Sequence, residues 1–94
     1  MPSFAIETKS RFRRKMRAVA EARRQEVAQA LDAVRDAFGH PHRHTGLGIR
    51  RLRRNFFECR AGRDLRLIFE MVPGALLFHD AGSHDDVQRF INNL

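Results

Sequence analysis

A chain of 94 residues has the mass of one domain and too little for two separate cores. Its 18 Lys and Arg against 11 Asp and Glu leave a net charge of +7, which favours an anionic partner, and a hydrophobic content of 43% excludes a disordered polar chain. No apolar run approaches the length of a membrane span, no secretory leader is recognisable, and the single Cys59 excludes an internal disulfide framework, so we expect a cytoplasmic protein that contacts no membrane.

The first half of the chain is predicted to be a short strand followed by helix. Within residues 3–7, Phe4 and Ile6 alternate as on one face of a strand. Residues 8–38 contain no Gly or Pro, and their apolar residues repeat with helical spacing on either side of a polar block at 23–26. This pattern allows either one long helix or two helices in a hairpin.

A loop at 39–48 and three strand-like runs follow. Gly39 and Pro41 end the helical region, and the loop carries three histidines whose irregular spacing argues against a metal site. The runs at 49–60, 65–72 and 75–81 are separated by short turns, which predicts an antiparallel meander.

The chain closes with a predicted helix. Ser83 is placed as an N-cap, and Asp85 and Asp86 follow in the first turn, where the helix dipole favours carboxylates. The predicted architecture is therefore a single α+β domain over residues 1–94, in which the opening strand and helical segment pack on an antiparallel sheet of about four strands.

Arginines dominate the region between residues 50 and 66. Strand alternation sends about half of them to each face, so one face should carry a basic stripe. Guanidinium groups bind phosphate in a bidentate manner, which predicts RNA binding, whereas a solvated face without a ligand is the alternative. The predicted RNA-binding residues are Arg50, Arg51, Arg53, Arg54 and Arg63.

The second half of the chain resembles a known family of toxins. The runs NFFECRAGRDLRLIFEMV, ALLFHDAG and GSHDDVQRF resemble the C-terminal half of the RelE/ParE superfamily, and the helical first half and strand order extend the resemblance to nearly the whole chain. Its sharpest parts are most similar to the branch that contains YafQ and YoeB. The resemblance implies a RelE-like fold and the toxin of a type II toxin–antitoxin pair, an endoribonuclease that cuts translated mRNA on the ribosome. The implied partner is a small acidic antitoxin.

The resemblance also implies a set of site residues. Such enzymes let a ribose 2′-OH attack the adjacent phosphate, which requires a proton acceptor, positive charge and a proton donor. His84 matches the functional histidine of the family, Arg66 matches an arginine that stabilises phosphate charge, and Arg60 occupies a position held by His or Arg. Asp64 and His44 match further functional positions, although Asp64 could equally be a turn residue bound to its own backbone. The implied reaction needs neither a metal nor another cofactor.

Two other classes of function remain open at this point. A ParE-like protein would poison DNA gyrase by binding, without chemistry of its own, and His84 with the two arginines argues against it. A catalytically quiet RelE-fold protein would bind RNA or an antitoxin. The absence of Tyr favours that interpretation, because the family often carries Tyr or Phe soon after the position of His84, whereas here the next aromatic residue is Phe90.

Overall fold

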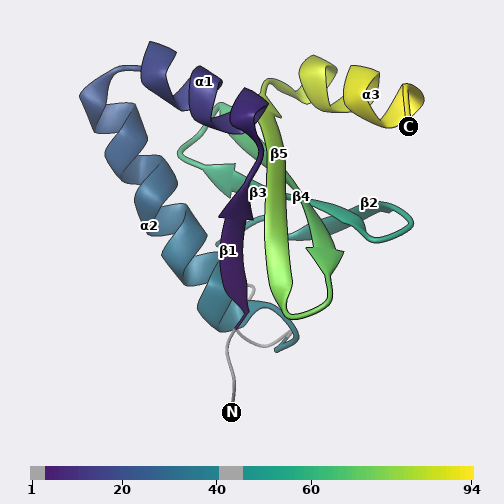
Figure 1. Cartoon of the computed structure of the whole chain (residues 1–94). Coiled ribbons are helices and arrows are strands. Elements are labelled where there is room, and N and C mark those ends of the chain that lie inside the picture. The colour runs from purple at the N-terminus through teal and green to yellow at the C-terminus, as the bar shows by residue number, and fades with distance from the viewer. Residues whose placement is uncertain (1–3, 41–45) are drawn as a thin grey trace.

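A five-stranded sheet forms the centre of the computed structural model, which describes residues 4–40 and 46–94. The strands are β1 (Ala5–Thr8), β2 (Arg50–Arg53), β3 (Phe56–Ala61), β4 (Leu65–Val72) and β5 (Ala75–Gly82). They lie in the order β1-β5-β4-β3-β2, and β2 to β5 form the predicted antiparallel meander (Figure 1). β1 pairs in parallel with β5. The α+β class is confirmed, but the sheet is mixed and has one strand more than expected.

The additional strand arises from the run 49–60, which was expected to be one strand and is divided into β2 and β3. The chain turns at Arg54, which has a φ of 54°. It is the one non-glycine residue with a positive φ in the described part of the chain. This left-handed conformation is unfavourable for an arginine, so the composition carries no turn signal there. Asn55 stabilises the turn, because its side-chain amide donates to the Met71 carbonyl at 2.7 Å and its own carbonyl accepts from the Met71 N–H at 2.8 Å.

Residues 10–37 form two helices, α1 (Ser10–Ala18) and α2 (Glu21–Ala37), so the long single helix is excluded. The chain is extended at Val19 and Ala20, with ψ angles of 158° and 154°. The break therefore precedes the polar block at 23–26 instead of coinciding with it.

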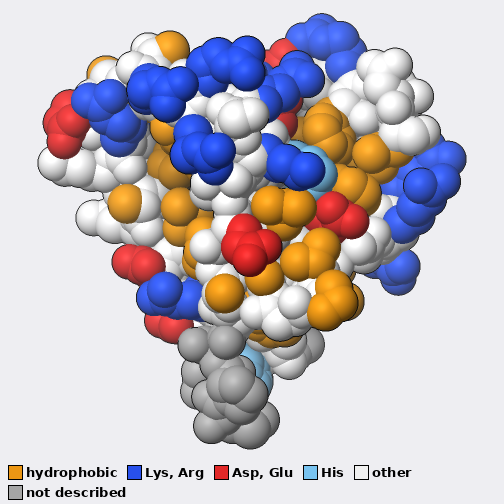
Figure 2. Space-filling view, in the orientation of Figure 1, with side chains coloured by type: hydrophobic (Ala, Val, Ile, Leu, Met, Phe, Trp, Pro, Cys, Tyr) orange, Lys and Arg blue, Asp and Glu red, His pale blue; other side chains and the backbone are white. Residues whose placement is uncertain are grey.

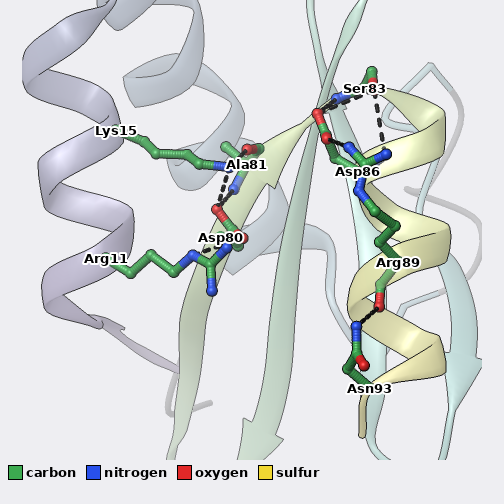
Figure 3. A network of polar contacts seen from close by, with 8 residues as sticks. All are labelled: Arg11, Lys15, Asp80, Ala81, Ser83, Asp86, Arg89 and Asn93. Carbon is green, nitrogen blue, oxygen red and sulfur yellow. Dashed lines mark hydrogen bonds and ion pairs between the residues drawn. The ribbon is translucent and has the colours of Figure 1, made fainter.

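Ion pairs with β5 hold α1 in an orientation that differs from that of α2. Lys15 donates to the Ala81 carbonyl at 2.7 Å and contacts the Asp80 carboxylate at 2.8 Å, and Arg11 contacts the same carboxylate at 3.1 Å (Figure 3). Asp80 is buried, and a buried carboxylate requires such partners. These contacts between α1 and β5 join segments far apart in the sequence, and the local pattern at 8–38 does not report them.

The two faces of the sheet bury separate apolar clusters. Helices α1 and α2 cover one face (Figure 1), where Phe69 stacks on Phe78 with ring centroids 5.0 Å apart. Helix α3 (His84–Asn92) covers part of the other face, where Val87 is buried against Phe56 and Ile68. No helix within the described ranges is long and apolar enough to cross a membrane.

Candidate functional site

Arginines from neighbouring strands meet on the sheet face opposite α1 and α2. Arg60 of β3 lies directly across from Arg66 of β4, and Arg66 lies across from Gly82 at the end of β5. Their sequence neighbours Cys59 and Leu67 belong to the core under α1 and α2, so strand alternation directs both arginines to the other face.

The side chains at this place line a hollow of about 400 Å³. Its lining residues are Gly48, Ile49, Arg50, Glu58, Arg60, Arg66 and His84. Three of the predicted catalytic residues, Arg60, Arg66 and His84, thus come together with the predicted RNA-binding Arg50. These four cationic or titratable side chains come from β2, β3, β4 and α3.

Glu58 lies at the floor of the hollow and was not anticipated as a site residue. Its side chain is 2% exposed. The Oε2 atom accepts from Arg50 Nε at 3.0 Å and Nη2 at 2.9 Å, and from Arg66 Nη1 at 3.4 Å. Its Oε1 atom is buried and has no hydrogen-bond partner among the described residues. Strand alternation places Glu58 on the face of Arg60, which was the one available sequence signal.

Arg60 lies across Gly48, and this contact explains why a glycine precedes β2. A Cβ atom on Gly48 would lie 2.8 Å from Cγ of Arg60, and Gly48 has a φ of 64°, which favours glycine. The Arg60 N–H donates to the Leu47 carbonyl at 2.9 Å. Leu47 and Gly48 therefore both contact Arg60, and Gly48 lines the hollow beside it.

His84 is the first residue of α3 and is exposed at the hollow. The predicted N-cap is confirmed: the Ser83 hydroxyl accepts from the Asp86 N–H at 3.2 Å, and the Asp86 carboxylate accepts from the Ser83 N–H at 2.8 Å (Figure 3). Hydrogen bonds from the backbone and side chain of Ser83, together with Arg89, lower the pKa of Asp86. This reciprocal capping box fixes the backbone that carries His84.

Of the other two predicted catalytic residues, the structure describes Asp64 alone, and Asp64 does not line the hollow. Asp64 is exposed in the turn between β3 and β4, and its carboxylate lies 3.6 Å from Arg23 on α2. His44 lies outside the described residues, as does His42. Within the described ranges, no group of three or more His, Cys, Asp or Glu is arranged to hold a metal ion.

The remaining predicted RNA-binding arginines are dispersed around β2 and β3. Arg51 and Arg54 line a different hollow, beside Phe57 and Met71. Arg53 donates to the Ile91 carbonyl of α3 at 3.4 Å. Arg63 is exposed in the β3–β4 turn. The arginines therefore do not form one continuous stripe.

Comparisons with known proteins concern the fold. No protein-family model matches the sequence. No curated protein matches it significantly. Among solved structures, a chain of the archaeal RelE–RelB complex from Pyrococcus horikoshii OT3 is similar with a TM-score of 0.70 and 10% identity, covering 86% of this chain and 94% of that chain.

Two further solved structures are similar to this chain in fold. The isolated E. coli RelE toxin has a TM-score of 0.67 and 10% identity, covering 98% of this chain and 100% of that chain. The YoeB dimer from Staphylococcus aureus has a TM-score of 0.65 and 13% identity, covering 87% and 98%. Identities this low establish the fold alone, and the predicted RelE-like fold is confirmed.

Proposed function

We propose that the chain is the toxin of a type II toxin–antitoxin pair and acts as a metal-independent endoribonuclease on mRNA at the ribosome. One observation carries the proposal: Arg50, Arg60, Arg66 and His84 line a single hollow on a RelE-like fold. Arginines offer charge and paired donors to a phosphate, and a histidine can exchange a proton near neutral pH.

The proposed reaction is an internal phosphoryl transfer. The ribose 2′-hydroxyl loses its proton as its oxygen forms a bond to the adjacent phosphorus. The bond from phosphorus to the 5′-oxygen breaks as that oxygen takes up a proton, which leaves a 2′,3′-cyclic phosphate and a 5′-hydroxyl. Arg66 and Arg60 stabilise the charge that develops on the phosphate oxygens, and His84 exchanges a proton with one of the reacting oxygens. Asp64 and His44 would take over the proton transfer only if His84 proves dispensable.

Charge and apolar surface together support a small acidic antitoxin as the partner. Figure 2 shows Lys and Arg side chains over α1 and at the edge formed by β2, with an apolar area between them on the part of the sheet that α3 leaves open. An acidic amphipathic segment would satisfy both features. RelE was solved in complex with RelB, and YoeB of Staphylococcus aureus with YefM. Arg51, Arg53, Arg54 and Arg63 would contact this partner or the flanking phosphates of RNA.

A catalytically quiet RNA- or antitoxin-binding protein is the second candidate. Phe90 packs against Phe56 and His79, with centroids at 5.7 and 5.8 Å, and so belongs to the cluster under α3. No phenylalanine lines the hollow within the described ranges, so no phenyl ring there is placed to stack on a base. This observation favours binding without efficient cleavage.

Induction of the chain alone in cells separates the candidates. The ribonuclease proposal expects growth arrest with cuts inside translated regions of mRNA. Intact mRNA with accumulating double-strand breaks in DNA would instead identify a gyrase poison. Intact mRNA and intact DNA, with RNA still bound by the purified chain, would identify the quiet binding protein.

A further inference from the structure

We propose that Glu58 is a positioning residue that orients the guanidinium groups of Arg66 and Arg50 toward the bound phosphate. This inference rests on the proposed ribonuclease function. It assigns the buried carboxylate a role in turnover, although Glu58 itself touches neither the phosphate nor the reacting oxygens.

The burial of Glu58 is the first step of the case. A carboxylate that is 2% exposed requires partners, and a buried oxygen without a donor is unfavourable. Glu58 Oε1 has no partner within the described part of the chain, whereas Oε2 accepts from two arginines. A hydrophobic residue could fill this strand position, as Phe56 and Ile68 do on the same face. The presence of a carboxylate at this position is therefore better explained by its contacts with Arg50 and Arg66 than by packing.

The two arginines are held unequally. Arg50 directs Nε and Nη2 to the same oxygen, at 3.0 and 2.9 Å, so its plane is fixed. Arg66 reaches that oxygen through Nη1 alone, at 3.4 Å. One such contact restrains the direction of the Arg66 side chain while its other N–H groups remain available to a phosphate.

Removal of the Glu58 charge has different expected effects on RNA binding and on turnover, depending on whether Glu58 acts through charge alone or as a positioning residue. Arg60 and Arg66 lie directly opposite each other on adjacent strands, and Arg50 adds a third positive charge. The Glu58 charge offsets part of this cluster, so a neutral residue would attract RNA more strongly. Positioning, in contrast, predicts slower turnover once the restraint is weakened. Binding and turnover therefore change in opposite directions only if Glu58 acts as a positioning residue.

Glu58→Gln is the decisive variant because it keeps the size of the side chain and removes its charge. We expect kcat for cleavage of ribosome-bound message to fall about 10–100-fold, with KM unchanged or lower. The matched control is Asp80→Asn, which removes the other buried carboxylate from its contacts with Arg11 and Lys15. We expect Asp80→Asn to lower the melting temperature without a fall in kcat at unchanged or lower KM. A parental kcat in folded Glu58→Gln, or a raised KM with kcat unchanged, overturns the proposal.

A double-mutant cycle with Arg66→Ala shows whether Glu58 acts through Arg66. If it does, Glu58→Gln should slow single-turnover cleavage in the parental chain and cause little further loss in the Arg66→Ala background. An equal fold-loss in both backgrounds contradicts the proposal.

Side-chain NMR of the unchanged chain covers the case in which Glu58→Gln does not fold. The Nε–Hε groups of Arg66 and Arg50 should show restricted motion compared with that of Arg63, which is exposed in a turn. Equal mobility of Arg66 and Arg63 would overturn the proposal. This readout needs no activity, so absence of RNA cleavage by the unchanged chain refutes the proposed function and leaves the restraint on Arg66 separately testable.

Discussion

His84 combines an exposed ring with a fixed backbone. Its main chain is held by the capping box of Ser83 and Asp86, while its side chain lies at the hollow that Arg66 and Arg60 line. A proton-transferring group needs this combination, because the reacting oxygen must come within hydrogen-bond distance of a ring that can still change its charge. Cys59, which lies in the core under α1 and α2, is not suited to such a role: burial, and then the charge of Glu58, raises the pKa of its thiol to about 12.

Replacement of His84 tests proton transfer directly. His84→Gln keeps a hydrogen-bonding side chain that cannot titrate near neutral pH, so we expect cleavage to slow by about 10²–10⁴-fold, nearly as much as in His84→Ala. Ribosome association should persist in both variants, and thermal melts should confirm folding, since substitutions of exposed residues usually cost little stability. Gln88→Ala, an exposed change one turn later in α3, serves as the control. A folded His84→Gln chain that cuts at the parental rate would remove His84 from the mechanism.

Among the elements, α3 was the most predictable and the region 49–60 the least. Ser83, the acidic first turn and the spacing of Val87, Phe90 and Ile91 are local signals, and the structure confirms the cap and the docking face. The division of 49–60 depends on Arg54 in a left-handed conformation that Asn55 stabilises through contacts with β4. Such contacts join segments far apart in the sequence, and local composition does not report them.

The same distinction applies to the site. Arg60, Arg66 and His84 could be nominated from motif and alternation, but their meeting with Arg50 depends on strand register. Glu58 was missed because the sequence pattern predicts a solvated surface position for a single acidic residue among arginines. Its burial arises only when β2 and β4 pair on either side of β3.

The capping box of α3 should be measurable as stability. Asp86→Ala removes the acceptor for the Ser83 N–H and should lower the free energy of unfolding by about 1 kcal/mol. Asp85→Ala is the matched control, because it removes an exposed carboxylate from the same first turn but leaves the capping box intact. Equal losses in the two variants, measured by urea unfolding at neutral pH, would show that only the interaction of carboxylates with the helix dipole matters.

The difference in stability between the parental chain and Asp86→Ala should depend on pH, and the direction of the Asp86 pKa shift predicts how. Folding lowers the pKa of Asp86, so the unfolded chain binds this proton more readily than the folded chain. The stabilisation is therefore fully present above the ordinary aspartate range and declines as the pH falls through that range toward the lowered value. The difference in stability between the parental chain and Asp86→Ala should shrink in acid, and a difference that grows in acid would contradict the assignment.

At the scale of the whole molecule, the fold places its charge where a phosphate chain could be held. Basic side chains gather over α1 and at the β2 edge (Figure 2), and three arginines line the hollow. Helix α2 pairs several of its own charges internally, as Arg24 does with Glu21. The hollow opens on the sheet face that α1 and α2 leave uncovered. A RelE-like scaffold of this size thus supplies neighbouring strands for three arginines and a helix start for one histidine.

The chemistry of the cut ends tests the central claim most directly. Purified chain is added to ribosomes that translate a defined message, and the new RNA ends are identified, with Arg66→Ala as the comparison. We expect 2′,3′-cyclic phosphates and 5′-hydroxyls inside the translated region, formed far more slowly by Arg66→Ala while ribosome association is retained. An intact message, or cuts that carry 3′-hydroxyl and 5′-phosphate ends, would contradict attack by the ribose 2′-oxygen at this site.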